Sequence, residues 1–314
     1  MRALKYMVLV ILALNACTKD DPTDSWSDTP GKHSYLLKID DEDRRLQVYV
    51  PTTYDGAPTP LVFMFHGSGG SGQSVFANSG WKEMAEMEGF IVIFPTALKY
   101  FVVELGEEQT KWSSFGLDRE LEPGTPIIDD IPFVRRMIKE AREAYNIDDR
   151  RIYASGFSNG GGFCRSRLMT EMSDVFAAIG TAGGLGLPEL VPQVSPDLIS
   201  LHTIMGNIDN KVQQRLMHAG PFPMCGSEIM GYPGLRHDID NILEMLKLDS
   251  VFTEDQDLPH FNTIVFDENQ SSYNNEYRIL MVNQMGHVYP NGQNHASGLK
   301  APEVFWEFFL QNPK

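Results

Sequence analysis

A serine set between glycines is the first feature of the sequence that could carry chemistry. The segment 156–160 reads Gly-Phe-Ser-Asn-Gly. It lies where a predicted strand, 151–157, ends and a predicted helix, 160–172, begins. Small residues on both sides of such a tight strand-to-helix turn let its serine project at the sheet edge. Ser158 is therefore the candidate nucleophile, and a glycine-rich helix start is the competing interpretation.

The candidate base is a histidine near the end of the chain. A serine hydroxyl is a weak nucleophile at neutral pH, so it needs a histidine base oriented by a carboxylate. After a nucleophile turn of this type the acid and then the histidine follow in the sequence. Of the eight histidines, three come late enough, and His287 directly follows the last predicted strand. His295 lies further into a Gly/Asn loop and His260 precedes a strand, so both fit less well.

The candidate acid stands at the tip of a turn. A buried run ending at Met205 continues as Gly-Asn-Ile-Asp, which places Asp209 just beyond a strand. Asp209 is the first choice and Asp197 the fallback. Aspartate also favours turns for conformational reasons alone, which is the competing interpretation.

Two backbone N–H groups are candidates for an oxyanion hole, which contributes roughly 3 to 4 kcal/mol per donor in comparable sites. One belongs to Asn159, directly after the serine. The other lies in the loop 66–70, His-Gly-Ser-Gly-Gly, where Ser68 is the expected donor and a plain glycine turn is the alternative. This chemistry requires neither a metal nor an organic cofactor, and no Cys/His spacing resembles a zinc site.

The elements that must position these groups alternate along the chain. Strands are predicted at 35–39, 44–50, 61–65, 90–94, 151–157, 177–181, 198–205 and 277–282, and helices at 81–88, 129–141, 160–172 and 303–310. The alternation implies right-handed crossovers, with helices on both faces of a mostly parallel sheet. We therefore expect the α/β class, with an N-terminal antiparallel hairpin and one domain spanning 35–314.

The first residues predict export. Residues 1–16 have the charged start and short apolar run of a signal peptide, and they lead into Leu-Asn-Ala-Cys, which resembles a bacterial lipobox ending at Cys17. Residues 17–34 are polar and are expected to form a flexible tether. We expect a lipid anchor in the outer membrane, possible display at the cell surface, and otherwise a periplasmic or secreted protein. A cleavable signal with an incidental cysteine is the alternative.

Charge and cysteine content restrict the partners. The formal net charge is −16 and the pI about 4.9, which argues against nucleic acid and makes an anionic polymer a poor substrate. Membrane contact is expected through the lipid anchor only. Cys164 and Cys225 either pair in an oxidising compartment or remain buried thiols, and the sequence leaves both possibilities open.

These motifs together resemble the family of bacterial poly(3-hydroxybutyrate) depolymerases and feruloyl or acetylxylan esterases. The resemblance covers most of the chain and is carried by the segments 65–67, 129–130, 156–161, 206–209 and 286–290. It implies an α/β-hydrolase fold and assigns the catalytic triad to Ser158, Asp209 and His287.

The resemblance also has departures and weaker implications. The family often has Gly-Gly-His-x-Trp-Pro, whereas Met285 and Tyr289 stand here in place of the first Gly and the Trp. Trp112 and Tyr289 are expected to contact substrate, although a tryptophan belongs more often to the core. The stretch 211–232 matches no family pattern and is expected to shape the acyl pocket.

The expected function is that of a secreted serine carboxylic ester hydrolase acting through an acyl-enzyme. Its substrate is expected to be a small-molecule or polymer-linked ester, with feruloyl or acetyl groups on plant polysaccharide preferred. Polyhydroxyalkanoate depolymerase is the alternative within the family. A serine peptidase and a non-catalytic surface-binding lipoprotein are the alternatives outside it.

Overall fold

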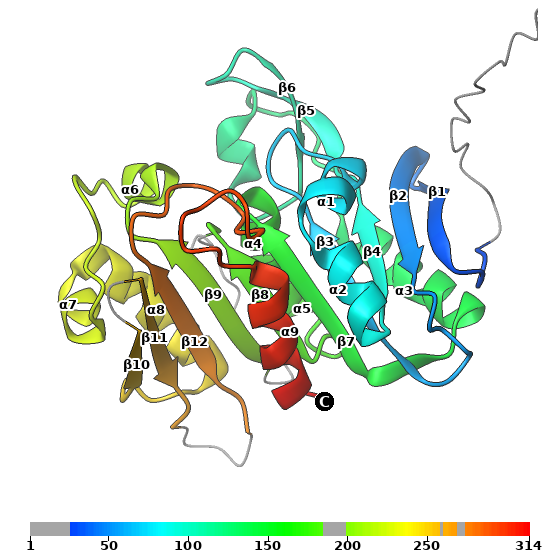
Figure 1. The fold of residues 1–314 in the computed structure, drawn as a ribbon. Coiled ribbons are helices and arrows are strands. Elements are labelled where there is room, and N and C mark those ends of the chain that lie inside the picture. The colour runs from blue at the N-terminus through cyan, green and yellow to red at the C-terminus, as the bar shows by residue number, and fades with distance from the viewer. Residues whose placement is uncertain (1–25, 185–198, 258–259, 269–273) are drawn as a thin grey trace, which may run out of the picture.

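The computed structural model describes residues 26–184, 199–257, 260–268 and 274–314. The predicted signal peptide, Cys17 and Asp197 lie outside these residues. A ten-stranded sheet runs through the molecule in the order β1-β2-β4-β3-β7-β8-β9-β12-β11-β10 (Figure 1). Its strands are β1 (Gly31–Ile39), β2 (Glu42–Val50), β3 (Thr59–Phe65), β4 (Ile91–Pro95), β7 (Ile147–Phe157), β8 (Ala178–Ala182), β9 (Ser200–Gly206), β10 (Thr253–Asp257), β11 (Phe261–Phe266) and β12 (Tyr277–Val282).

The six strands from β4 to β12 in this order are parallel, and antiparallel pairs close both edges of the sheet. The helices are α1 (Gly72–Asn78), α2 (Trp81–Glu88), α3 (Ile131–Ala144), α4 (Asn159–Phe163), α5 (Met169–Glu171), α6 (Asn210–Arg215), α7 (Gly226–Gly231), α8 (Pro233–Leu246) and α9 (Ala301–Gln311). Helices α1, α2 and α9 cover the face drawn toward the viewer in Figure 1, and α3, α5 and α8 lie behind the sheet. The predicted α/β class is confirmed.

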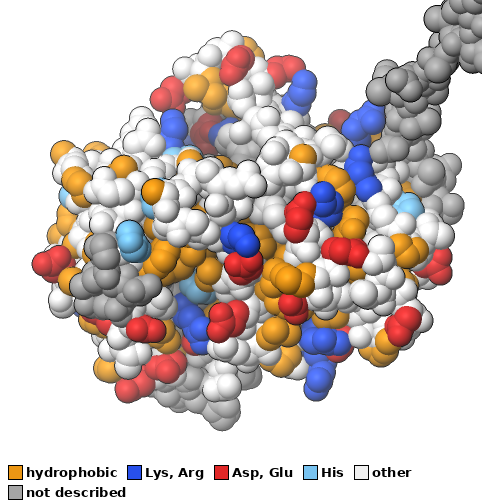
Figure 2. All heavy atoms as spheres, in the orientation of Figure 1, with side chains coloured by type: hydrophobic (Ala, Val, Ile, Leu, Met, Phe, Trp, Pro, Cys, Tyr) orange, Lys and Arg blue, Asp and Glu red, His pale blue; other side chains and the backbone are white. Residues whose placement is uncertain are grey.

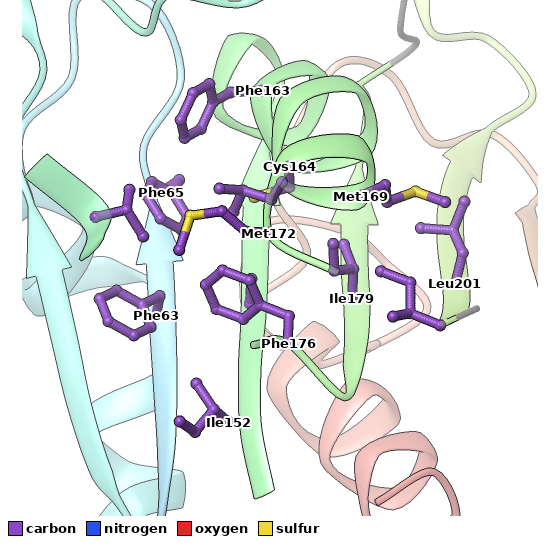
Figure 3. Close-up of a cluster of buried hydrophobic side chains, with 14 of the residues drawn as sticks. Phe63, Phe65, Ile152, Phe163, Cys164, Met169, Met172, Phe176, Ile179 and Leu201 are labelled. Carbon is purple, nitrogen blue, oxygen red and sulfur yellow. The ribbon is translucent and has the colours of Figure 1, made fainter. Parts of the chain in front are cut away.

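The central strands are apolar throughout because helices cover both of their faces. Every residue of β3, β4, β8 and β9 is buried, as expected for strands of a parallel sheet. One core cluster lies between the sheet and the helices behind it. Figure 3 shows part of this cluster, where Phe63 and Phe65 from β3 meet Met172 and Phe176 beneath the helical segment that follows β7.

A smaller core lies on the opposite face of the sheet, under α2 and α9. It is rich in aromatic rings, and Phe90 stacks on Trp306 with centroids 4.1 Å apart. Tyr153, from the middle of β7, stacks on Phe309 with centroids 4.6 Å apart. The C-terminal helix is therefore fixed against the strand that leads into the candidate nucleophile.

The N-terminal hairpin is longer than predicted. Strand β1 begins at Gly31, and Asp40 and Asp41 form its two-residue turn with φ of 48° and 68°. Such left-handed pairs match the twist of a hairpin, and aspartate tolerates them. Trp26 already stacks on Tyr35 with ring centroids 4.7 Å apart. The end of the segment assigned to the tether therefore packs against the domain.

One insertion between β4 and α3 has no counterpart in the sequence prediction. Strands β5 (Leu98–Val102) and β6 (Glu107–Lys111) form a separate hairpin, followed by the 3₁₀ turn η1 (Leu117–Glu120). It stands above the carboxyl ends of the parallel strands (Figure 1). The polar sequence of β6, Glu-Glu-Gln-Thr-Lys, explains why it was missed, since it lacks the apolar alternation that predicts a strand.

The helix predicted at 160–172 is divided into three parts. Helix α4 passes into a π-helical turn, η2 (Cys164–Leu168), and then into α5. Cys164 lies within this segment and points into the core (Figure 3). Cys164 and Cys225 are both free thiols, and burial raises the pKa of Cys164 well above its ordinary value. The Cys164 side chain therefore serves packing.

Charges are spread over the surface. Acidic, basic and apolar side chains are interspersed over the face drawn in Figure 2. Several charged side chains of the described residues form exposed pairs, such as Arg142 with Asp149 at 2.7 Å. Within the described part of the chain, none of the helices combines the length and apolar character needed to cross a membrane.

Two histidines are buried in the folded protein. Burial lowers the pKa of His66 to about 4 and that of His202 to about 3. His202 packs edge-on against Phe305 and Phe308, and its ring nitrogens have no hydrogen-bond partner among the residues that the structure describes. Both side chains are therefore neutral at pH values where an exposed histidine is protonated.

Acidification is expected to destabilise the protein through these histidines. A depressed folded-state pKa contributes stability above the unfolded pKa of about 6.5, and this stability is lost as the pH falls toward about 4. Urea unfolding at about pH 7.5 and pH 5 should show a loss of about 2 kcal/mol for each histidine. His202→Phe should remove about half of this dependence, whereas His237→Phe, on the exposed side of α8, should retain it. Equal dependence in both variants would contradict the assignment.

Candidate active site

Ser158 sits at a strained turn between β7 and α4. Its φ and ψ are 52° and −119°, a conformation that non-glycine residues seldom adopt and that costs of order 1 to 3 kcal/mol. The turn is possible because its flanking residues lack side chains. A Cβ on Gly156 would lie 2.5 Å from the carbonyl oxygen of Gly160, and one on Gly160 would lie 2.5 Å from that of Phe65. The Gly-x-Ser-x-Gly spacing thus follows from the closeness of α4, β7 and β3.

The structure brings Ser158, His287 and Asp209 together from three strand ends. The imidazole Nε2 of His287 lies 2.8 Å from Oγ of Ser158, and its Nδ1 lies 2.9 and 3.0 Å from the carboxylate oxygens of Asp209. With its proton on Nδ1, the ring donates to the carboxylate and accepts from the serine hydroxyl. This arrangement lets the ring take the serine proton during attack.

Asp209 is held independently of the histidine. It is buried, and its Oδ1 accepts from the backbone N–H groups of Lys211 and Val212 at 3.0 and 3.1 Å as the N-cap of α6. The first turn of α6 therefore fixes the carboxylate that orients His287. The other late histidines lie elsewhere, His260 beside Phe261 and His295 bonded to Ser297.

The predicted oxyanion donors border the same cavity as Ser158. Ser68 and Asn159 both line it, and a Cβ on Gly67 would lie 3.2 Å from Cβ of Ser158. Within the loop the amides of Gly69 and Gly70 are already bonded, to the carbonyls of Thr110 and Gly67. The Ser68 amide has no acceptor among the described residues, so it is available to an oxyanion.

The side chain of His66 holds the loop 66–70 in place through two hydrogen bonds. Its Nδ1 donates to the carbonyl of Gly67 at 2.7 Å, and its Nε2 accepts from the amide of Ala97 at 3.0 Å. Both contacts require the neutral ring, which the lowered pKa provides. The histidine thus links the oxyanion loop to the segment after β4.

Thr110 of the β5–β6 hairpin forms hydrogen bonds with the loop 66–70. The sequence did not predict this contact. The Thr110 carbonyl accepts from the Gly69 amide at 3.0 Å, and the Thr110 hydroxyl donates to the Gly70 carbonyl at 2.6 Å. A lone threonine in a polar segment gives no signal of this role. Only the three-dimensional arrangement identifies it.

Thr110→Val is expected to lower kcat on an aryl ester by about two- to tenfold, the value of one hydrogen bond. The isosteric change removes the hydroxyl that fixes Gly70, so the oxyanion loop loses preorganisation. KM should change less than kcat, because the loop contacts the transition state more than the bound substrate. Thr110→Ser restores the hydroxyl and should restore kcat. A valine variant with unchanged kcat would show that the loop holds without this bond.

The Trp112 side chain does not line the cavity beside Ser158, which differs from the expectation that it contacts substrate. Its side chain is fully buried between Phe65 and Phe163, and its indole N–H donates to the His66 carbonyl at 2.9 Å. Its backbone is nevertheless important, because the Trp112 amide donates to Oδ1 of Asn159 at 2.7 Å. The tryptophan belongs to the core, as its large apolar surface favours.

A buried ion pair fixes Ser113, the residue that follows Trp112. Asp130 accepts from the Ser113 amide at 2.7 Å and pairs with Arg44, which is itself fully buried and lies over Phe133. The acidic pair before α3 that supported the resemblance therefore anchors the segment beside the nucleophile turn.

Tyr289 also turns away from the cavity, which corrects a second expectation. Its hydroxyl accepts from the indole N–H of Trp81 at 2.8 Å and lies 3.3 Å from Oγ of Ser155. Its ring packs edge-on against Phe157, which in turn lies against His287 with centroids 5.0 Å apart. Tyr289 therefore anchors the loop that carries the histidine.

The cavity around Ser158 has a volume of about 650 Å³, which is within the usual range for small-molecule sites. Ser158, His287, Ser68 and Asn159 border it. Its outer walls come from the segment 102–120 and from α6, namely Val102, Glu104, Leu105, Lys111, Phe115, Arg119, Glu120, Lys211, Gln214 and Arg215.

The stretch 211–232 contributes to the cavity only through its first turn and a half. Lys211, Gln214 and Arg215 on α6 line the wall. Phe222 is buried in the core instead, and Met217 is 94% exposed. The expectation that the whole stretch shapes the pocket is therefore too broad.

Comparison with known proteins finds relatives that match part of the chain in sequence. No protein-family model matches the chain. It is 29% identical over 142 residues to a bifunctional acetylxylan esterase/xylanase of Neocallimastix patriciarum, covering 45% of this chain and 18% of that protein. It is 29% identical over 136 residues to feruloyl esterase B of Piromyces equi, covering 43% and 23%. The matches thus span less than a quarter of each relative.

Solved structures show the fold. An acetyl xylan esterase from Aspergillus awamori superposes with a TM-score of 0.58 at 14% identity, covering 89% of this chain and 98% of that one. A likeness at this identity concerns the backbone alone, and it shows the α/β-hydrolase fold. The relatives in sequence are named as acetylxylan and feruloyl esterases, and the chain is similar to these two over less than half of its length.

Proposed function

We propose that the protein is a serine carboxylic ester hydrolase that works through an acyl-enzyme. The observation that carries the proposal is the relay from Asp209 through His287 to Ser158, with hydrogen bonds of 2.8 to 3.0 Å, opening onto a cavity with available amide donors. Nucleophile, base and orienting acid are the parts that acyl transfer requires.

The reaction follows from the contacts. Oγ of Ser158 attacks the ester carbonyl carbon while its proton passes to Nε2 of His287, and Asp209 stabilises the resulting imidazolium. The carbonyl oxygen, now negative, is bound by the amides of Ser68 and Asn159. The imidazolium then protonates the departing alkoxide, which leaves an acyl-serine and a free alcohol. Water, deprotonated by the same histidine, attacks the acyl-serine and releases the acid.

The proposed substrates are feruloyl or acetyl esters on plant polysaccharide. The names of the two relatives in sequence support this class. The size of the cavity favours an acyl group larger than acetyl, and its wall presents the apolar side chains of Val102, Leu105 and Phe115 to an aromatic ring. Feruloyl is therefore the preferred acyl group of this proposal.

Release of ferulate, acetate and 3-hydroxybutyrate from their natural esters tests the proposal. We expect ferulate release from feruloylated arabinoxylan to exceed the others, and expect all release to disappear in Ser158→Ala. Preferred release of 3-hydroxybutyrate would instead indicate a polyester depolymerase. Cleavage of a peptide amide without ester turnover would indicate a peptidase. A folded protein that hydrolyses none of these esters would indicate a non-catalytic binding function.

We also propose that the enzyme is exported and lipid-anchored through Cys17. The support is the sequence pattern of residues 1–17 and the polar segment behind it. Mass spectrometry of the N-terminal peptide from a bacterial host tests this: the proposal requires a diacylated cysteine at the mature terminus, and an unmodified Cys17 would refute it.

A further inference from the structure

The cavity wall formed by α6 has a charge opposite to that of the protein. The chain carries 26 basic and 42 acidic residues. Among the described residues that line the cavity the balance is reversed, because four are basic, Lys111, Arg119, Lys211 and Arg215, and two are acidic, Glu104 and Glu120. A local field of this kind acts over about 8 Å in physiological salt, whereas the distant negative charges are screened.

Two of these basic side chains, Lys111 and Lys211, differ in their ion pairing. Lys111 is committed to an ion pair with Glu120. The ammonium group of Lys211 instead has no ion-pair or hydrogen-bond partner in the part of the chain that the structure describes. Lys211, Gln214 and Arg215 occupy positions i, i+3 and i+4 of α6, so they share one face of the helix. That face presents an ammonium, an amide and a guanidinium group to the cavity.

The mechanism indicates which part of the substrate meets this wall. His287 must reach the leaving oxygen to protonate it, so the alcohol portion of the ester departs on the histidine side. Asp209, which binds His287, is the N-cap of α6, so the first turn of α6 adjoins that side. The carbonyl oxygen is drawn instead toward Ser68 and Asn159. The α6 wall is therefore the alcohol side of the site.

We propose that the α6 face formed by Lys211, Gln214 and Arg215 binds a uronate carboxylate on the sugar that carries, or neighbours, the esterified hydroxyl. Ammonium and guanidinium groups form charge-assisted hydrogen bonds with a carboxylate, and the glutamine amide suits the adjacent hydroxyls. The inference rests on the proposed esterase function. It reverses the expectation, drawn from net charge alone, that an anionic polymer is a poor substrate.

Two substrates that differ only in one functional group test the subsite. The first is an acetylated or feruloylated glucuronoxylan oligosaccharide, and the second is the same oligosaccharide with its uronate carboxyl reduced to an alcohol. We expect kcat/KM to be higher on the carboxylate form, and Lys211→Gln to lower the ratio between the two forms about two- to fivefold, as expected for one partly exposed charge pair. High salt should lower the ratio in the wild type more than in the variant.

Lys139→Gln is the matched control, since Lys139 is an exposed lysine on α3, behind the sheet, and should leave the ratio at its wild-type value. Equal kcat/KM on the two forms, or an equal ratio in Lys211→Gln and wild type, would overturn the subsite. Absence of turnover on both oligosaccharides would overturn it as well. Turnover of a phenyl ester in the same preparation would then show that the proposed esterase activity survives the failure of the subsite.

Discussion

Replacing Ser158 with alanine is expected to lower kcat on a p-nitrophenyl ester by on the order of 10⁶-fold, because the substitution removes the oxygen that forms the proposed acyl intermediate. The strained turn holds the hydroxyl 2.8 Å from Nε2 of His287 before substrate arrives, so the nucleophile is already positioned. Alanine removes the attacking atom and leaves the amide donors in place. KM should change little, because the hydroxyl contributes to the transition state more than to substrate binding.

Covalent labelling tests the assignment of Ser158 as the nucleophile without a measurement of turnover. An aryl phosphonate should add one adduct to the wild-type protein, on the peptide that contains Ser158, and none to Ser158→Ala. Ser166→Ala is the matched control, because Ser166 borders the same cavity but bonds to the Gly162 carbonyl within its own helix. Labelling of the Ser158→Ala protein at another residue would contradict the assignment of the nucleophile.

Asp209→Asn is expected to lower kcat about 10⁴-fold with little change in stability. The asparagine oxygen can still accept from the amides of Lys211 and Val212, so the α6 cap is kept. Its amide nitrogen, however, faces Nδ1 of His287 as a donor and favours the wrong tautomer. His287 then carries its proton on the nitrogen that must accept from Ser158.

Asp209→Ala separates the catalytic role of this residue from its structural role. The alanine removes the cap as well as the charge, which should cost an additional 0.5 to 2 kcal/mol or so of unfolding free energy. Thermal unfolding and aryl ester kinetics on the two variants distinguish the contributions. A kcat within tenfold of wild type in Asp209→Asn would mean that another group orients His287.

The three candidate catalytic groups could be predicted because each is tied to a local pattern, and the structure places them within hydrogen-bond distance of one another. Ser158 requires glycines at fixed positions, and these glycines are visible in the sequence whatever the rest of the chain does. Asp209 and His287 each follow a short, largely apolar run that is bounded by turn residues, a pattern that favours a buried strand. The strand order then brings the three together.

The walls of the cavity could not be predicted in the same way. Strand β6 is polar, and the role of the β5–β6 hairpin depends on Thr110 contacting the loop 66–70, some forty residues away. Trp112 and Tyr289 were assigned to substrate because aromatic residues are common near such sites, yet each has a buried polar partner that turns it inward. Which way an aromatic side chain points is decided by neighbours that are distant in sequence.

The separation of the three groups along the chain has a consequence for biosynthesis. Ser158 and His287 are 129 residues apart, and they meet only when β12 is paired with β9 in the completed sheet. A nascent chain that lacks β12 has the proposed nucleophile but not the proposed base. The proposed ester hydrolysis therefore requires the last parallel strand to be in place, and an unfinished chain is expected to be inactive.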